Sequence, residues 1–496
     1  MDHPDDSIRT NSGATAGEGY RLFWVDTLLL ALALRVLLVP LSPYFGYPGD
    51  HDDFVRWGVQ AVDDGVTSLY DHPPRRLPLR VREDGEWITT ERRFDRLCNY
   101  PPGSAYRLAV SGWVFSRLSS DRVVNTTLSQ YCFSAWVIVC DVILAAGAAA
   151  LARHFGDERT ARWAWGLMLF LPPLWWDSVV WAQTDTMLLA PAIWMLWSMV
   201  RQRWMLAGVL WGVAASLKPQ AILLLPVWGL ALLAPPRSTA DAGDASARWQ
   251  PLAGLAAGAL TLNLIALPFT LHSGWAWFRA SYWDNLFATY SHLTTLKAFN
   301  VWYVDLLLTL SDDATTPCLG LTRDAWGKFM LAVALLAGLA WSAVRWRGRA
   351  EGLLLYASLS LLAFMMLPTQ VHERYLVLVL PFVCVASLRW PAVRAGFAGL
   401  TIVALAQVTW PIWLDVDPAG MREVREAARA AHVELRQFEA HRLPPELRSL
   451  PDLEAVFRRA YRELRARTAP IEWVFVVLAL ASSVATVAAI VRIRPP

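Results

Sequence analysis

The chain has 496 residues, of which 55% are hydrophobic and only 18% are charged. A soluble protein of this size carries about 25% charged residues, so the composition excludes an ordinary soluble globular protein. The formal net charge of +3 is too small to indicate a nucleic-acid-binding protein. The 27 tryptophans fit a membrane protein, because indole rings prefer the membrane–water interface.

Apolar runs of about 20 residues recur along the chain, and each predicts a membrane-crossing helix because lipid offers the backbone no hydrogen-bond partner. The first twenty residues are polar, so we expect an N-terminal tail over residues 1–21 and no cleavable signal peptide. Prolines at Pro172–Pro173 and Pro219 predict broken or re-entrant helices. The fold class is predicted as all-α, a polytopic transmembrane helical protein of about twelve spans: 22–42, 128–152, 161–176, 183–200, 204–217, 219–234, 251–271, 325–344, 352–368, 375–390, 394–414 and 471–491.

Arginines in the short loops set the expected orientation, because positively charged loops stay in the cytoplasm. Twelve spans with a cytoplasmic N-terminus put all of these loops inside, and we expect both termini there. The segment 415–470 is an exception, since it carries nearly as many acids as arginines and falls outside. The arginines used are Arg153, Arg159, Arg162, Arg201, Arg203, Arg345, Arg347, Arg349, Arg389, Arg394, Arg492 and Arg494.

Three stretches are too long to be simple connectors. Two are outer loops, and the third is expected to form two amphipathic helices, near residues 422–440 and 453–467. The predicted organisation is a polar tail (1–21), a transmembrane module (22–414) with outer loops 43–127 and 272–324, an amphipathic helical loop (415–470), and a last span with a basic C-terminus (471–496).

Three acids, Asp50, Asp52 and Asp53, follow directly on the first span. Carboxylates that crowd beside a membrane surface repel one another, which favours proton transfer by one of them. The alternative is a solvated turn that caps the following helix. That helix has an apolar stripe through Trp57 and Val62, so we expect it to lie on the membrane surface.

Two further motifs put polar groups into apolar surroundings. Gln183 and Asp185 of WAQTD begin the fourth span, and ionisable groups at membrane depth are costly enough to indicate function. Lys218 of SLKPQ lies between two apolar segments on the outer side, where positive charge is disfavoured. It is expected to pair with a phosphate or an acid. The alternatives are an ordinary interfacial Asp185 and a snorkelling Lys218.

A turn between the ninth and tenth spans contains His372, Glu373 and Arg374 in PTQVHERYL. An arginine can grip a phosphate with two parallel hydrogen bonds, and a histidine can donate to it or titrate near neutrality. The alternative is a short polar turn without a function. Weaker candidates are the CNYPP turn, with Asn99 and Tyr100, and the second outer loop, with His292, Lys297, Asn300 and Trp302.

When the arginines alone fix the orientation, five motifs fall on the non-cytoplasmic face: GDHDD, CNYPP, WAQTD, SLKPQ and PTQVHERYL. This face therefore holds acids, a histidine and two cations beside a lipid surface. Such groups suit a reaction in which a general base activates an acceptor while cations stabilise a departing phosphate.

The motifs resemble those of the GT-C superfamily of membrane glycosyltransferases, whose donors are polyprenyl-phosphate sugars. The resemblance is closest to the dolichyl-phosphate-glucose and -mannose transferases and their bacterial relatives. It implies inverting transfer of a hexose (mannose or glucose) or a pentose at the extracytoplasmic face of a bacterial plasma membrane. The matching motifs follow the family order from residue 47 to residue 376: GDHDD, NYPP, WAQTD, KPQ, AFNVW and HERY.

The resemblance also implies roles for single residues. One of Asp50, Asp52 and Asp53 would be the base that deprotonates the acceptor, with Asp52 or Asp53 preferred. His372 and Arg374 would bind the donor phosphate, with Lys218 as a second cationic contact. The substrate pocket would be lined by Gln183, Asp185, Glu373, Asn99, Tyr100 and Asn300.

The implied partners are a polyprenyl-phosphate sugar donor, a lipid-linked or glycan acceptor and membrane lipid, with no nucleic acid. No cofactor is predicted, although the acidic cluster is compatible with a divalent metal. Arginine follows Glu373, whereas the eukaryotic enzymes tend to have a lysine-containing version of this motif. The resemblance therefore does not identify the donor sugar of this protein. The alternative function is a secondary transporter or lipid-linked sugar flippase. Transporters tend to show two similar halves and midplane charges, which this sequence lacks.

Overall fold

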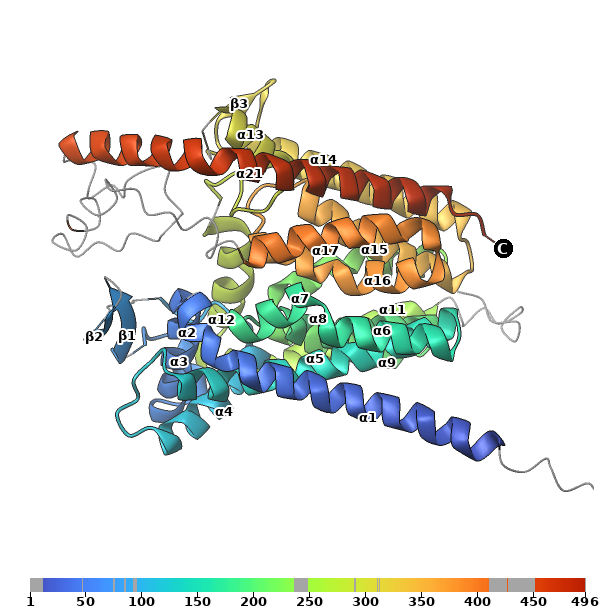
Figure 1. Cartoon of the computed structure of the whole chain (residues 1–496), viewed down its shortest axis with the longest axis horizontal. Coiled ribbons are helices and arrows are strands. Elements are labelled where there is room, and N and C mark those ends of the chain that lie inside the picture. Colours follow the sequence, from blue (N-terminus) through green and yellow to red (C-terminus); the bar gives the residue numbers. More distant parts are fainter. Residues whose placement is uncertain are drawn as a thin grey trace, which may run out of the picture.

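The computed structural model describes residues 12–46, 48–74, 76–83, 86–91, 96–235, 249–289, 291–309, 311, 313–409, 426 and 451–495. Helices make up most of this part of the chain, as predicted. The long helices run side by side along one direction (Figure 1). The predicted helix near 422–440 and the start of the polar tail lie outside the described residues.

Six helices are long and apolar enough to cross a membrane, which confirms a polytopic membrane protein. They are Leu22–Phe45, Thr127–Phe155, Gln250–Ser273, Arg323–Arg345, Pro391–Val408 and Ala466–Arg492. Four shorter apolar helices accompany them: Asp185–Val200, Trp204–Leu217, Pro219–Leu233 and Ala350–Met366.

Prolines interrupt helices at the two places that the sequence predicts, Pro172–Pro173 and Pro219. Span 161–176 divides into α6, α7 and the start of a π-helical turn, η3. Pro219 opens a 3₁₀ turn, η4, before α10. The bounds of the helices in the bundle are α1 (Ser12–Leu38), η1 (Val39–Leu41), α5 (Thr127–Phe155), α6 (Glu158–Phe170), α7 (Pro172–Trp175), η3 (Trp176–Val180), α8 (Asp185–Val200), α9 (Trp204–Leu217), η4 (Pro219–Leu224), α10 (Leu225–Leu233), α11 (Gln250–Ser273), α14 (Arg323–Arg345), α15 (Ala350–Met366), η7 (Glu373–Leu378), α16 (Leu380–Arg389), η8 (Pro391–Val393), α17 (Arg394–Val408) and α21 (Pro451–Arg492).

Elements of the two outer loops gather at one end of the bundle, whereas α1 begins and α21 ends at the other (Figure 1). Strand β1 pairs with β2 in antiparallel register, Pro78 opposite Glu91, and β3 pairs with β4, Cys318 opposite Leu321. The bounds are α2 (Ser42–Phe45), α3 (Pro48–Asp63), η2 (Val66–Tyr70), β1 (Pro78–Glu83), β2 (Glu86–Glu91), α4 (Pro102–Leu118), α12 (Ala276–Phe278), η6 (Arg279–Ala288), α13 (Val301–Thr309), β3 (Pro317–Cys318) and β4 (Leu321–Thr322).

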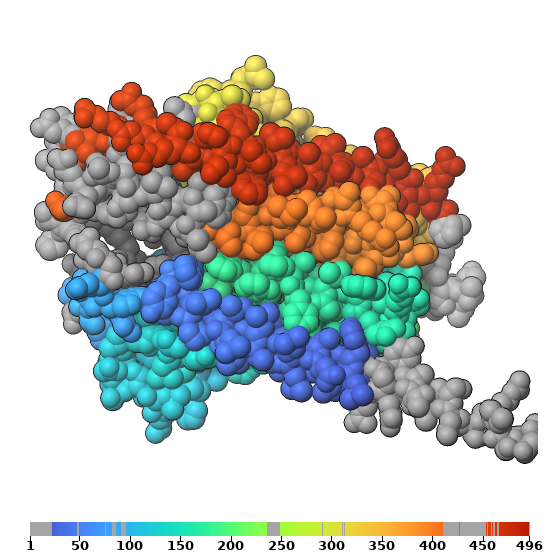
Figure 2. Space-filling view, viewed as in Figure 1, coloured from blue at the N-terminus to red at the C-terminus, as the bar shows by residue number. Residues whose placement is uncertain are grey.

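Figure 2 shows α1 in blue and α21 in red on opposite flanks of one face, with the green and orange helices between them. The predicted helix 453–467 and the last span form one continuous helix, α21, with Pro470 inside it. A proline removes one backbone hydrogen bond from a helix without necessarily ending it.

Small residues allow the closest helix contact in the bundle, between α9 and α11. A Cβ atom added at Gly208 would lie 1.8 Å from the carbonyl oxygen of Gly254, so only glycine fits there. Close backbone approach at small residues is how helices pack where lipid removes the hydrophobic driving force. Helix α9 ends at Leu217, and Lys218 begins the next segment.

One sequence-based expectation needs correction. The helix after the acids forms as α3, but Trp57 is only 1% exposed and packs near Tyr100, so this part of the stripe faces the outer-loop core and not lipid. The two loop cysteines, Cys98 and Cys318, are both free thiols. Cys98 is buried and Cys318 is exposed.

Candidate active site

Arg374 connects segments that lie far apart in the sequence. Its Nη1 lies 3.7 Å from Asp50 Oδ2, and its Nε lies 3.4 Å from Asp185 Oδ2. Asp50 is in the first turn of α3, and Asp185 is the first residue of α8. The positive end of a helix dipole favours acids at both positions. The structure therefore brings three predicted site residues into one cluster.

Lys218 is the second cation of this cluster. Its Nζ donates a hydrogen bond to Asp185 Oδ1 at 2.5 Å, and its side chain is only 2% exposed. Its ammonium group also lies over the ring of Tyr375 at 5.5 Å, and Gln220 donates to the Tyr375 hydroxyl at 2.7 Å. A snorkelling lysine would reach solvent, so this alternative is wrong.

Gln183 reaches the cluster from the loop before α8. Its Nε2 donates to Asp50 Oδ2 at 2.9 Å, and its backbone N–H donates to the carbonyl oxygen of Asp177, also at 2.9 Å. The preceding residue, Ala182, has a positive φ of 53°. This left-handed turn is unusual for alanine and lets the loop direct the Gln183 amide toward Asp50.

His372 and Glu373 directly precede Arg374 in the chain and lie beside it in the cluster. His372 Nδ1 is 3.9 Å from Glu373 Oε2, and Glu373 Oε1 is 3.8 Å from Arg374 Nη1. Burial and the nearby charges of Arg374 and Lys218 hold the pKa of His372 well below its usual value, so the imidazole is neutral. Burial raises the pKa of Glu373.

The second outer loop holds this turn by its backbone. Leu296 donates its N–H to the carbonyl oxygen of Val371, and Glu373 donates to the carbonyl oxygen of Leu296, both at 3.0 Å. The residues of PTQVHERYL are therefore positioned by a loop about 75 residues earlier in the sequence.

The other two acids of the first loop point elsewhere. Asp52 Oδ1 is 2.6 Å from Arg56 Nε in a buried pair within α3, and Asp53 Oδ2 is 3.6 Å from Arg96 Nη1. Asp52, two residues after Asp50, projects from another side of the helix, whereas Asp53, three residues after Asp50, is directed to Arg96. Of the three acids, Asp50 is thus the one that the structure puts beside Asp185 and Arg374. Its side chain is 23% exposed, so it is also within reach of a substrate.

The three remaining predicted pocket residues differ in their surroundings. The Tyr100 side chain interacts electrostatically with Arg374, Asp50 and Asp185 and is 9% exposed, so it belongs to the cluster. Asn99 contacts the second outer loop, since its carbonyl oxygen accepts from Asn285 at 3.4 Å.

Asn300 instead caps helix α13. Its Oδ1 accepts hydrogen bonds from the backbone N–H groups of Trp302 at 3.0 Å and Tyr303 at 3.2 Å. Asparagine is common as a helix cap, so its position directly before an apolar helical run already indicated a structural role in the sequence. Its Nδ2 donates to the carbonyl oxygen of Pro368 at 3.4 Å, so these hydrogen bonds serve the local backbone and not the charged cluster.

Two charged residues near the cluster were missed by the sequence reasoning. Arg96 lies beside Asp53, and its positive charge is one of the causes that lower the pKa of His372. Asp177 is fully buried in η3 and interacts with Asp185, Lys218 and Arg374. A single acid in the apolar run WWDSVVW was the signal for Asp177, because a buried acid needs a partner or a proton.

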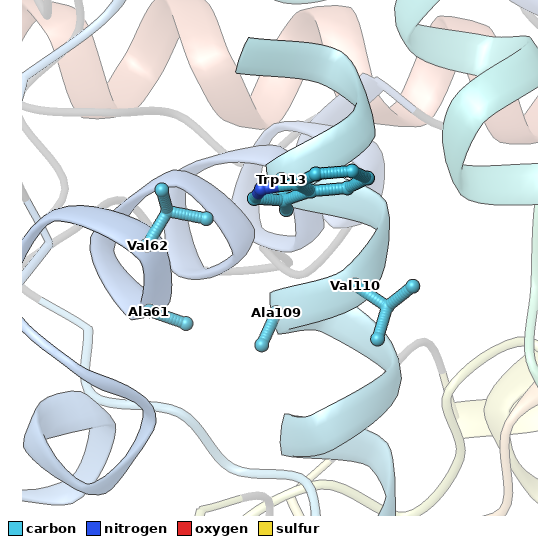
Figure 3. A pocket seen from close by; sticks show the side chains of 5 residues that line it. All are labelled: Ala61, Val62, Ala109, Val110 and Trp113. Carbon is cyan, nitrogen blue, oxygen red and sulfur yellow. The ribbon is translucent and has the colours of Figure 1, made fainter. Parts of the chain in front are cut away.

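A separate apolar groove of about 330 Å³ lies between α3 and α4 (Figure 3). Asp50 starts α3 and Ala61 lies eleven residues later, which is about 16 Å along a helix. The groove is therefore distinct from the charged cluster, and its chemistry suits a hydrocarbon chain. It is lined by Ala61, Val62, Ala109, Val110 and Trp113.

Among the described residues, no three His, Cys, Asp or Glu side chains converge in a way that could hold a metal ion. The acids of the cluster are instead interleaved with Lys218 and Arg374. The arrangement can accept a proton at Asp50 and can stabilise an anion beside Arg374.

Two solved structures of the Archaeoglobus fulgidus oligosaccharyltransferase are similar to this chain. The apo form is 11% identical with a TM-score of 0.38, and the alignment covers 93% of this chain and 56% of that one. The form tethered to an acceptor peptide with the NVT sequon is 12% identical with a TM-score of 0.33, covering 93% and 55%. The chain thus spans little more than half the length of that oligosaccharyltransferase. No curated protein matches the chain.

A family model gives the identity of the chain. The model of glycosyltransferase family 87 matches residues 99–368, more than half of the 496 residues. The match includes the NYPP, WAQTD, KPQ and AFNVW motifs and ends just before HERY. It agrees with the resemblance to the membrane glycosyltransferases. The chain belongs to glycosyltransferase family 87.

Proposed function

We propose that this protein is an inverting glycosyltransferase that uses a polyprenyl-phosphate sugar at the extracytoplasmic face of a membrane. The transferred sugar is a hexose or a pentose, and the acceptor is lipid-linked or a glycan. One observation carries the proposal: a partly exposed carboxylate, Asp50, lies 3.7 Å from the guanidinium of Arg374. A base and an anion-binding cation are then both within reach of one bound substrate.

Asp50 is the proposed general base. It accepts the proton of the acceptor hydroxyl while the acceptor oxygen forms a bond to the anomeric carbon. The bond between this carbon and the phosphate oxygen breaks, and the electron pair leaves with the polyprenyl phosphate. Attack from the side opposite the phosphate converts a β-linked donor into an α-glycoside. Gln183 supports this role, because its hydrogen bond at 2.9 Å holds one carboxylate oxygen and so orients the other.

Arg374 is the proposed main contact of the donor phosphate. Its ion pairs measure 3.4, 3.7 and 3.8 Å, longer than the 2.7–2.9 Å typical of charge-assisted hydrogen bonds. The guanidinium can therefore form shorter hydrogen bonds to phosphate oxygens without first losing a tight partner. The neutral His372 adds a ring N–H donor, and Lys218 adds a fixed positive charge behind Asp185.

Lipid-borne substrates are supported by the outer-loop surface. The groove between α3 and α4 has only apolar lining residues, and α3 itself begins with the acids (Figure 3). A lipid chain in the outer leaflet could occupy such a surface while its polar head approaches Asp50.

The test is a transfer assay with the purified full chain in lipid nanodiscs. Radiolabelled polyprenyl-phosphate mannose, glucose and pentose are offered with membrane glycolipid acceptors. Asp50→Asn should lower kcat at least about a hundredfold, because general base catalysis contributes that much or more. Asp63→Asn is the matched control: it lies in the same helix and pairs with Arg122 at 2.7 Å near the far end of α3.

The control should keep transfer close to that of the unmodified protein. Full transfer by the Asp50→Asn variant would reject Asp50 as the base. Absence of transfer from every polyprenyl-phosphate sugar, with a correctly folded protein, would reject the donor class.

A further inference from the structure

Asp177 is a buried acid that the proposed reaction does not use. It is 0% exposed, and neither carboxyl oxygen has a hydrogen-bond partner among the described residues. It is the second residue of η3, which follows the short helix α7 that opens with the double proline. An unpaired carboxylate in such a place is strongly disfavoured, so Asp177 needs either a counter-charge or a proton.

The neighbouring charges come from several elements. Asp185 of α8, Lys218 before η4 and Arg374 of η7 act on Asp177 from the side of the site. Asp141 of α5 acts from the bundle side. Arg35 of α1 also lies on the bundle side, where its Nε is bound to Asp141 at 2.6 Å.

The other elements packed on η3 add little charge. The segments η1 and α2 contain no Asp, Glu, Lys, Arg or His, and α2 contributes only the phenol of Tyr44. The one charged residue of α17 is Arg394, at its first position. Among the described residues, no arginine or lysine of these elements donates a hydrogen bond to Asp177.

Charge balance decides which form of Asp177 fits a bound donor. Asp50 and Asp185 balance Lys218 and Arg374, and Glu373, a third acid at 3.8 Å from Arg374 Nη1, adds no positive charge, so these five residues offer no surplus cation. A polyprenyl-phosphate sugar is a phosphodiester and brings one negative charge at any working pH. An ionised Asp177 would add a second negative charge in a buried site, where repulsion is poorly screened.

Resting on the proposed function, we propose that Asp177 is a proton-linked positioning residue of the donor site. It carries a proton while the donor phosphate is bound, and donor affinity falls as pH rises and this carboxyl ionises. The sign follows from linkage, because the bound state holds more protons than the free state on the alkaline side. Its backbone carbonyl also accepts from Gln183, whose amide holds Asp50, so the same segment orients the proposed base.

The experiment measures binding of farnesyl methyl phosphate to the full chain in neutral nanodiscs between pH 6 and 9. This probe is a phosphodiester with constant charge and no sugar, so the result does not depend on which sugar is transferred. In the unmodified protein, affinity should fall with rising pH, by up to about tenfold per pH unit for one linked proton. Asp177→Asn imitates the protonated acid and should remove this decline.

Asp63→Asn is the matched control, because Asp63 is paired with Arg122 at the far end of α3 and is not among the charges that act on Asp177. It should follow the pH profile of the unmodified protein. Coincident profiles for Asp177→Asn and the unmodified protein would overturn the proposal and would assign the decline to another group such as Lys218. Equal weakening by Asp177→Asn at every pH would also overturn it.

A second measurement needs no variant. Calorimetric titrations in two buffers with different ionisation enthalpies report the protons taken up on binding. Uptake that approaches one proton on the alkaline side supports the proposal, and no uptake between pH 6 and 9 overturns it. These outcomes are separate from the transfer assay, in which failure of every donor sugar would reject the proposed function itself.

Discussion

Two buried arginines of this protein have opposite surroundings. Arg35 in the bundle is bound at 2.6 Å to Asp141, and its Nη1 donates to the carbonyl oxygens of Leu169 at 3.0 Å and Ala31 at 3.2 Å. Arg374 at the outer loops lies between three carboxylates, with all three ion pairs between 3.4 and 3.8 Å. Both side chains are at least nine-tenths buried.

The difference separates a structural pair from a binding site. A short pair with further backbone acceptors uses most of the donors of a guanidinium and fixes the helices that carry it. A looser set of acids compensates the charge but leaves the planar group able to accept a ligand of matching geometry. Removal of Arg374 should therefore affect activity, and removal of Arg35 should affect stability.

The largest effect is expected for Arg374→Ala. Loss of a cation that stabilises the departing phosphate should lower kcat/KM about a thousandfold or more. The melting temperature should change little, because Asp185 keeps Lys218 and Asp50 keeps Gln183 as partners. Transfer assays and thermal unfolding on the same preparation measure the two effects.

Arg374→Lys is the matched variant, because it keeps the charge but loses the paired donors. It should be more active than Arg374→Ala and still well below the unmodified protein. An Arg374→Ala variant that unfolds but transfers normally per folded molecule would reverse the assignment of the two arginines.

The next effect is expected for Arg35→Ala. This change leaves Asp141 buried without its cation and should lower the free energy of unfolding by about 3 kcal/mol. Ser178 still donates to Asp141 at 2.8 Å, which limits the loss. Denaturant titration measures it, and transfer per folded molecule should stay within about threefold of the unmodified protein, as for a residue remote from the chemistry.

A double variant with leucine at positions 35 and 141 sharpens this test. Replacement of a buried ion pair by apolar residues is often neutral or stabilising, so the double variant should recover most of the lost stability. A double variant that stays as unstable as Arg35→Ala would show that the pair does more than compensate its own charges.

Much of the charged cluster could be predicted from the sequence. Asp185 and Lys218 each interrupt apolar surroundings, where a charge is retained only if a partner or a function repays its desolvation. Arg374 stands out because it shares a very short turn with His372 and Glu373. All three motifs contribute to one cluster in the structure. Helix breaks at Pro172–Pro173 and Pro219 could be predicted as well, because proline lacks the backbone donor.

The choice among the first-loop acids could not be made from the motif alone. Asp50, Asp52 and Asp53 share one helix, and only its packing decides which side faces the site. A signal was present nonetheless, because Arg56 follows Asp52 by four residues, the spacing of a helical ion pair. Asp177 was missed for a different reason, since most of the charges that act on it, Lys218, Arg374 and Asp141, lie far away in sequence.

The smallest effect is expected for Asp52→Asn. This variant tests, inside the outer loop, the rule that a short buried ion pair is structural and not part of the binding site. Asp52 and Arg56 form a 2.6 Å pair with both side chains at most 1% exposed, which resembles the pair of Arg35 with Asp141. The asparagine keeps one acceptor oxygen for Arg56 but loses the charge, so the free energy of unfolding should fall by about 2 kcal/mol. Transfer per folded molecule should be nearly unchanged, whereas Asp50→Asn should abolish it at normal stability. The two acids belong to the same motif and are only two residues apart. The two variants therefore test whether the length of an ion pair, and not the motif alone, indicates which acid is functional. A stable Asp52→Asn protein without transfer would make Asp52 the base, and the distinction between short and loose ion pairs would fail with it.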